Sequence, residues 1–277
     1  MRAQKIRGAI SGAVGIVVTS VLFIVPFLFI LVQAMKDRKE SALLDFTWPE
    51  NIVFWENLVE VITFRDNMVV RAFWNSTVLT VASVTLMIVF GAMVAYIIQR
   101  RPGKISKTIN GFVLAGLIIP PAVVPTIFLM QALGIFKTLH GLVFIEVAFG
   151  LSFTILLFRG FIATIPKELD EAAIIDGAGP LRLFFQVVFP LLKSVIVTAV
   201  ILQSIFVFND FQNPLYFLPG DDNVTVQLTL FNFQSQFLSQ YNLLFMDILL
   251  ITIPMLILFL IFNKRIVAGM TSGAVKG

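Results

Sequence analysis

Long stretches without charge are the feature that most restricts the possible folds of this sequence. A helix needs about 20 mostly apolar residues to cross the hydrocarbon of a bilayer, because each residue adds about 1.5 Å. Runs of that size recur through the 277 residues, interrupted inside only by Glu146, Asp210 and Asp247. They lack the strict alternation of a membrane β-strand. The sequence therefore predicts an all-α integral membrane protein, a single transmembrane domain over 1–277, with six transmembrane helices at about 11–34, 72–98, 108–132, 141–161, 191–213 and 241–263.

Composition excludes a soluble fold. Hydrophobic residues make up 58% of the chain and charged residues 13%, whereas soluble domains carry about 25% charged residues. A soluble chain of this size has too much surface to hide that much apolar area. The chain has no Cys and one His, which excludes disulfides, thiol catalysis and thiolate metal sites. No metal or cofactor site is expected.

The first apolar stretch begins like a secretory signal, since it follows Arg2, Lys5 and Arg7. It is longer than the 7–15-residue apolar region of a signal peptide, and no small-x-small cleavage site precedes Lys36. We expect it to be a retained first helix.

The distribution of Lys and Arg predicts the orientation of the chain. With the N-terminus inside, 14 of the 20 basic residues fall in the inner segments, as the positive-inside rule requires. Both termini are then cytoplasmic, in the inner membrane of a bacterial cell. The net charge of +4 is thus a topology signal, and no nucleic-acid partner is expected.

The segment 164–190, between the fourth and fifth predicted spans, has the signals of a helix–turn–helix elbow outside the membrane. Thr164 is a suitable N-cap for a first short helix. Gly177 can supply the left-handed residue that ends it. Pro180 can open a second short helix, which Pro190 would end.

The first helix of this elbow has a small-residue face. Leu169, Ala172, Ala173 and Asp176 share one side of a helix, flanked by acids. Helices that rest on lipid usually combine Lys or Arg with bulky apolar residues. The alanines, which allow close approach, favour docking of another protein over a lipid contact.

The elbow also resembles a known family. Glu171-Ala172-Ala173, the glycine four residues later at Gly177, and Phe189-Pro190 are similar to the EAA loop of binding-protein-dependent ABC importer permeases. Phe189 stands where Leu is commoner. The resemblance implies a cytoplasmic coupling helix, with the ATPase-docking residues Glu171, Ala172, Ala173, Asp176 and Gly177.

Three further stretches resemble the carbohydrate permeases related to the smaller membrane subunit of the maltose system. They are Arg159-Gly160-Phe161 with 165–169, the segment Phe208-Asn209-Asp210-Phe211, and the tail from Gly269 to Gly277. The resemblance runs from about Asn75 to the end of the chain.

The resemblance implies a set of partners. They are a second permease subunit, two cytoplasmic ATPase subunits, an extracytoplasmic solute-binding protein, a carbohydrate substrate and membrane lipid. ATP and Mg would lie on the ATPases, because this chain has no G-x-x-x-x-G-K-[ST] loop, and it is not expected to be an enzyme. The cytoplasmic tail 264–277 would contact the ATPases through Thr271, Gly273, Lys276 and Gly277, and the outer loop 218–236 would reach toward the binding protein.

Polar residues in the spans are candidates for the substrate path. Asn209, Asp210 and Asn213 follow the fifth apolar run, where amides and carboxylates suit sugar hydroxyls; a hydrogen-bonded helix end is the alternative. Glu146 is a fourth candidate, because charged groups inside membranes are costly. It lies in the outer part of its span, where it can reach the interface.

The third predicted span contains Pro120, Pro121 and Pro125, which must kink it. These prolines are candidates for a hinge, and a fixed kink is the alternative.

Membrane proteins of three functional classes can have a chain of this kind. An ABC importer permease fits best. An ion-coupled secondary transporter would be expected to show repeats and broken helices near the midplane, and a membrane enzyme would need clustered catalytic groups. Within the first class, an oligosaccharide is the expected substrate and a glycerol-phosphate-type solute the alternative.

Overall fold

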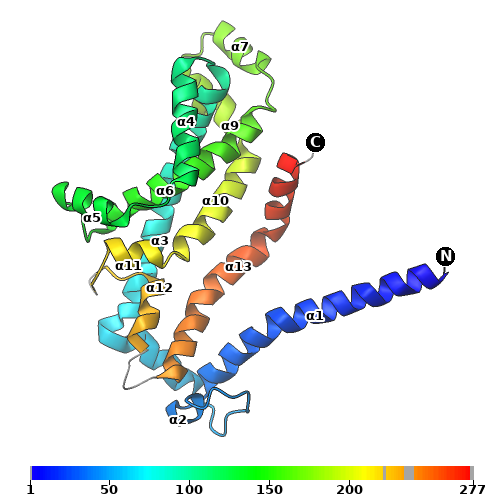
Figure 1. Cartoon of the computed structure of the whole chain (residues 1–277), viewed down its shortest axis with the longest axis vertical. Coiled ribbons are helices and arrows are strands. Elements are labelled where there is room, and N and C mark those ends of the chain that lie inside the picture. Colours follow the sequence, from blue (N-terminus) through cyan, green and yellow to red (C-terminus); the bar gives the residue numbers. More distant parts are fainter. Residues whose placement is uncertain (1, 221–222, 234–239, 275–277) are drawn as a thin grey trace. The chain divides into compact units, whose positions relative to one another are not determined.

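The computed structural model describes residues 2–220, 223–233 and 240–274, and every regular element in these ranges is a helix (Figure 1). The chain forms two compact units. Unit 1 comprises Met1–Val70 and Thr229–Pro254, and unit 2 comprises Arg71–Leu228 and Met255–Gly277.

Unit 1 contains the long apolar helix at the start of the chain and the first part of the one at its end. Its elements are α1 (Arg2–Met35), α2 (Arg38–Ser41), the first part of α3 (Phe54–Arg100), η2 (Leu230–Phe233) and the first part of α13 (Tyr241–Ala274). Asn57 joins them, because its Nδ2 donates to the carbonyl oxygens of Ala34 and Lys36, each at 2.9 Å. Its Oδ1 accepts from Asn242 Nδ2 at 2.7 Å. These buried amides connect α1, α3 and α13 by hydrogen bonds between helices.

Helix α3 begins earlier than the sequence predicts. The predicted second span starts at residue 72, but the helix that contains it starts at Phe54. Charges such as Glu56 mark a segment as unsuited to lipid without making it a poor helix former. The helix is broken once, at Arg65, Asp66 and Asn67, where φ is +43°, +54° and +58°.

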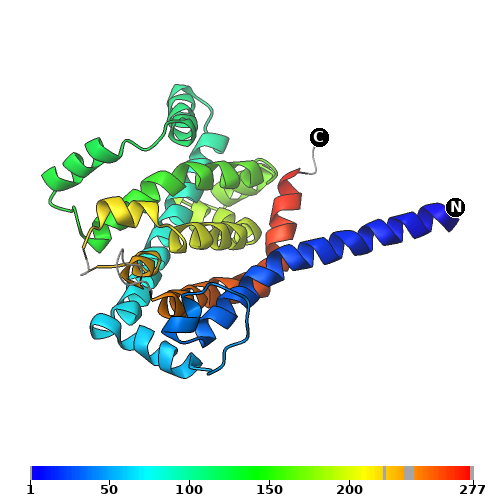
Figure 2. The same ribbon diagram turned by 60° about the horizontal axis from the view of Figure 1, so that its bottom comes forward.

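Unit 2 is built around the second part of α3, α6 and α10. Helices α6 and α10 lie side by side in Figures 1 and 2. In chain order, the elements of unit 2 after α3 are α4 (Lys104–Ile118), α5 (Val123–Ala132), α6 (Leu139–Ile162), α7 (Glu168–Ile175), α8 (Pro180–Arg182), η1 (Leu183–Val188), α9 (Phe189–Leu191), α10 (Lys193–Phe208), α11 (Gln212–Phe217), most of α12 (Val226–Thr229) and the second part of α13.

The helices of unit 2 approach closely where side chains are small. A Cβ added to Gly150 on α6 would lie 2.5 Å from Met87 Sδ, and one added to Gly91 on α3 would lie 2.8 Å from Thr154 Cγ2. Small residues at helix interfaces are how membrane helices gain packing contacts. Between α10 and α6, the Gln203 amide donates to Thr154 Oγ1 at 2.8 Å and to the Gly150 carbonyl oxygen at 3.1 Å.

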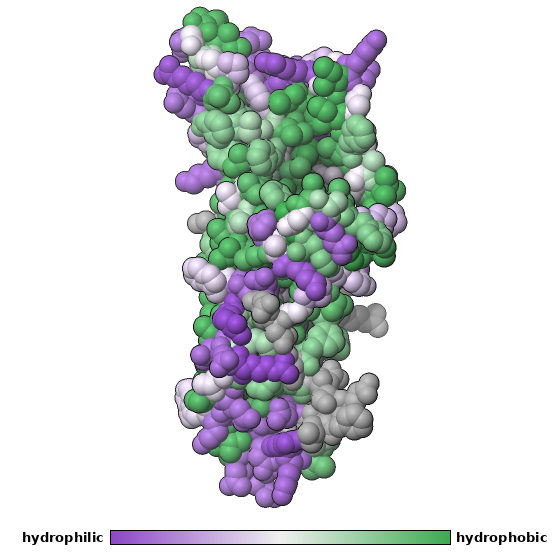
Figure 3. Space-filling model, turned by 90° about the vertical axis from the view of Figure 1, so that its left-hand side faces the viewer, coloured by the Kyte–Doolittle hydropathy of each residue, from purple (hydrophilic) through white to green (hydrophobic). Residues whose placement is uncertain are grey.

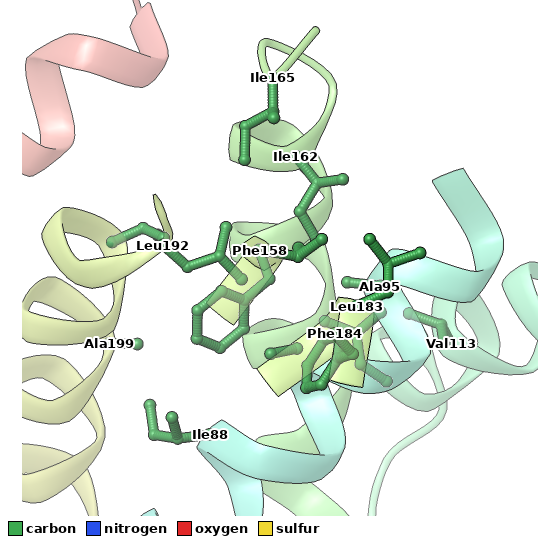
Figure 4. Close-up of a cluster of buried hydrophobic side chains, with 14 of the residues drawn as sticks. Ile88, Ala95, Val113, Phe158, Ile162, Ile165, Leu183, Phe184, Leu192 and Ala199 are labelled. Carbon is green, nitrogen blue, oxygen red and sulfur yellow. The ribbon is translucent and has the colours of Figure 1, made fainter. Parts of the chain in front are cut away.

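One end of unit 2 holds its larger hydrophobic core. Phe158, which is fully buried, lies at the centre of this core (Figure 4). Side chains from α3, α4, α6, η1 and α10 pack around it, among them Ile88, Ala95, Val113, Ile162, Leu183, Phe184 and Ala199. The core thereby fixes the elbow that follows α6.

Two bends interrupt the apolar stretches. The predicted third span, 108–132, is two helices, α4 and α5, that meet at 118°. The bend falls at Pro120 and Pro121, which lack the backbone N–H that a continuous helix needs; Pro125 lies in the first turn of α5. The second bend, of 78°, precedes α10.

By length and composition, the described residues hold four helices able to cross a membrane. These are Val14–Met35, Phe54–Arg100, Leu139–Ile162 and Tyr241–Phe262. The number becomes six if each bent pair is counted as one span.

Candidate coupling elbow and substrate path

The first helix of the elbow, α7, ends as the sequence predicts. Gly177 follows it with a φ of +79°, and the Ala178 N–H bonds back to the Ala173 carbonyl oxygen at 2.9 Å. This is the hydrogen bond of a glycine-terminated helix end. Its beginning was predicted wrongly. Thr164 does not cap α7, because its hydroxyl donates to the Phe161 carbonyl oxygen at the end of α6, and the residue before α7 is Lys167.

The second arm of the elbow begins at Pro180, as predicted. It does not end at Pro190, which lies inside α9. The preceding segment η1 is π-helical, and the Phe189 N–H bonds to the Phe184 carbonyl oxygen, five residues back. The wider π turn allows a proline next to it, and the arm continues to Leu191.

The residues of the predicted docking face differ in their exposure to solvent. Ala173 is buried against the hydrophobic core, while Glu171, Ala172, Asp176 and Gly177 are exposed. Two apolar residues that the sequence analysis did not single out are also exposed, Ile174 by 59% and Ile175 by 86%. Hydrophilic residues gather at the end of unit 2 that carries α7 (Figure 3). The elbow thus offers a mixed acidic and apolar surface.

An ion pair fastens the buried side of α7 to α3. Arg100 Nε lies 2.8 Å from Asp170 Oδ2, and the Tyr96 hydroxyl donates to the same oxygen at 3.2 Å. Arg100 also donates from Nη2 to the carbonyl oxygen of Ile165 at 2.9 Å. The sequence gives no signal for this contact, because the two charged residues are far apart in the chain.

Three of the four candidate path residues meet. Asn213 Nδ2 donates to Glu146 Oε1 at 3.2 Å, and the Asp210 carboxyl lies close enough to that of Glu146 for the two to interact electrostatically. Glu146 is fully buried, so its expected reach to the interface was wrong. It faces the start of α11 instead.

The fourth candidate, Asn209, lies apart from this group. Its Nδ2 donates to the Ile205 carbonyl oxygen at 2.9 Å, and its Oδ1 accepts from Gln227 Nε2 at 3.2 Å. Asp210 Oδ1 accepts from the backbone N–H groups of Gln212 and Asn213 at 2.8 and 3.3 Å. Asp210 therefore caps the start of α11, which is the alternative to a role in the substrate path.

The tail residues are only partly described. Thr271 and Gly273 lie on the backbone of α13, which ends at Ala274. Lys276 and Gly277 lie outside the described residues, as do parts of the outer loop 218–236.

Taken together, the apolar helices and the elbow define a membrane protein with an exposed short helix between two of its apolar stretches. The chain belongs to the family of binding-protein-dependent transport system inner membrane components, whose sequence pattern matches residues 87–272.

The particular relatives are curated permeases. The melibiose/raffinose/stachyose import permease protein MelC of Bacillus subtilis is 34% identical over 256 residues, covering 91% of each chain. The multiple sugar-binding transport system permease protein MsmG of Streptococcus mutans is 32% identical over 266 residues, covering 94% of each.

A solved structure shares the fold. It is a crystal structure of a bacterial ABC transporter involved in the import of the acidic polysaccharide alginate, similar with a TM-score of 0.82 and 20% identity. The match covers 95% of this chain and 98% of that one.

Proposed function

We propose that this chain is the permease subunit of an ATP-driven, binding-protein-dependent importer of a carbohydrate, with an oligosaccharide as substrate. The observation that carries the proposal is the elbow, where Glu171, Ala172 and Asp176 face outward on a helix whose other side is anchored in unit 2. The sugar substrates in the names of the similar permeases support it.

In the membrane, each bent pair of helices counts as one span, which gives six. The excess of Lys and Arg in the inner segments places both termini in the cytoplasm. The α7 elbow then lies on the cytoplasmic side, at the bacterial inner membrane.

Two ATPase subunits dock on the cytoplasmic side and carry ATP and Mg, so this chain is not itself an enzyme. Its mixed surface suits a protein cleft, because the acids favour a basic rim while Ile174 and Ile175 supply apolar contact area. The tail residues Thr271, Gly273, Lys276 and Gly277 contact the same ATPases. A second permease subunit completes the path, and the solute-binding protein docks near 218–236.

The substrate path includes the group formed by Glu146, Asp210 and Asn213, with Asn209 beside it. Carboxylates and amides accept and donate hydrogen bonds to hydroxyl groups. Two adjacent acids disfavour a phosphate by charge repulsion. The group therefore favours a neutral sugar over a glycerol-phosphate-type solute.

The test uses the complete importer, with all subunits co-expressed and reconstituted in proteoliposomes together with the binding protein. Glu171→Ala should lower the amount of co-purifying ATPase and the uptake of sugar, because it removes an exposed acid from the docking surface. Glu168→Ala is the matched control, since Glu168 is an exposed acid at the start of the same helix.

A second pair of variants tests the shape of the elbow. Gly177→Asp should also release the ATPase, because Asp is strained at a φ of +79°. Gly179→Asp is the control, since the φ of Gly179 is −70°. Raffinose and glycerol 3-phosphate serve as alternative solutes. A native chain that purifies without any ATPase, and takes up solute only under an ion gradient, would contradict the proposal.

A further inference from the structure

The coupling elbow touches the rest of unit 2 in two different ways. Its backbone continues into α6 on one side and into α8 on the other. Its polar contact with α3 is made across the fold, at the ion pair of Arg100 and Asp170, beside the hydrophobic packing of Ala173 in the core.

This ion pair is shielded from solvent. The Arg100 side chain is 8% exposed and that of Asp170 is 11% exposed. Charges removed from water interact more strongly than surface pairs, and breaking such a pair by removing one partner is strongly unfavourable. The contact is therefore costlier to break than a surface salt bridge.

Hydrogen bonds add to the ion pair, and Asp170, Arg100 and Tyr96 together form what we call the clamp. The Tyr96 hydroxyl donates to the same carboxylate oxygen, so two residues one helical turn apart on α3 hold Asp170. Arg100 also donates to the Ile165 carbonyl oxygen in the segment before α7. One guanidinium thus holds α7 and its leading segment together.

The clamp and the proposed docking surface lie on opposite sides of α7. Asp170 is buried, whereas its chain neighbour Glu171 is exposed. A partner that displaces α7 through Glu171 and Ala172 must also displace Asp170. Because Arg100 is the last residue of α3, the displacement reaches the end of that helix.

We propose that Asp170, Arg100 and Tyr96 are positioning residues that transmit movement of the elbow to α3, and so link ATP hydrolysis to solute transport. This inference rests on the proposed function. In this proposal the docking surface binds the ATPase, and the clamp passes movement of the elbow to the helices that line the substrate path.

The first test measures sugar imported per ATP hydrolysed by the reconstituted importer. Asp170→Asn keeps the shape of the side chain and removes its charge. It should leave the amount of co-purified ATPase unchanged and lower the ratio of sugar to ATP by roughly tenfold, within the range usual for coupling between sites. Glu168→Gln, which neutralises an exposed acid on the same helix, should keep the native ratio.

A second test separates transmission from stability. Because the chain has no Cys, an Arg100→Cys, Asp170→Cys variant in cysteine-free partners can be bridged by a reducible bis-thiosulfonate reagent. Sugar transport per ATP should be low before bridging, rise after bridging and fall again on reduction. A fold defect alone would not follow the bridge reversibly.

The outcomes distinguish the two proposals. If Asp170→Asn retains the native ratio, or if it releases the ATPase, the clamp does not transmit movement. If bridging fails to raise the ratio, the inference is likewise wrong. If the native chain holds no ATPase, the proposed function fails, and the inference fails with it.

Discussion

The Lys36 ammonium group is fully buried and lies 2.5 Å from Asp45 Oδ1, whose side chain is 39% exposed. Lys36 Nζ also donates to Thr47 Oγ1 at 3.2 Å. The loop after α1 is thus folded around a charge that cannot reach water.

This pair predicts an acid-sensitive loop. The hydrogen bond from Lys36, helped by that from Thr47, lowers the pKa of Asp45 to about 2. A lowered pKa adds stability above the ordinary pKa of Asp, and this stability is lost as the pH falls from about 4 toward 2. The melting temperature in detergent should therefore drop in that window for the native chain. Asp45→Asn should melt lower at neutral pH and lack this drop, whereas Glu50→Gln, at an exposed position of the same loop, should retain it.

Close packing of α6 against α3 predicts a size limit at Gly150. Gly150→Ala would place a Cβ 2.5 Å from Met87 Sδ, and overpacking of this kind costs about 1–3 kcal/mol. Gly160→Ala is the control on the same helix, because nothing lies within 4 Å of its added Cβ. Thermal unfolding should show a lower melting temperature for Gly150→Ala only. Equal melting temperatures would mean that Met87 moves aside freely.

The buried group around Glu146 predicts that Asn213 is needed for stability. Asn213→Ala removes the amide that donates to Glu146 Oε1, and a buried acceptor left without a donor costs about 1–3 kcal/mol. Asn209→Ala should have a smaller effect, within about 0.5 kcal/mol, because Asn209 is exposed. Chemical unfolding of the two variants compares them directly. A similar decrease in the free energy of unfolding of both variants would contradict the expectation that the hydrogen bond from Asn213 to Glu146 stabilises the fold.

The break in α3 predicts a stabilising substitution. Asp66 has a φ of +54°, a conformation that costs an L-residue about 1–2 kcal/mol and glycine very little. Asp66→Gly should therefore raise the melting temperature, whereas Asp66→Ala should not. If both variants behave alike, the break is not strained at this residue.

Local signals predicted much of this fold. Apolar length located the helices, and Gly177 and Pro180 set the end of α7 and the start of α8 as expected. The errors arose where a local signal had competing uses. Thr164 can cap a following helix or bond back to a preceding one, and it does the second.

Contacts between distant residues could not be predicted in the same way. Nothing in a single sequence pairs Arg100 with Asp170, or Glu146 with Asn213, because these pairs form only after α3, α6, α7 and α11 have packed. Polarity alone marks the candidate path residues in the sequence, and it does not distinguish Asn209, which accepts a hydrogen bond from Gln227, from Glu146, Asp210 and Asn213, which lie together.

The exposed isoleucines of α7 have a consequence for biosynthesis. On the proposed function, a newly made copy of this chain to which no partner subunit has docked presents Ile174 and Ile175 to the solvent, on the same helix as exposed Leu169. Such a surface is a target for chaperones and proteases in the cell. Orphan copies should therefore be short-lived, so balanced synthesis of the subunits sets how much intact complex accumulates.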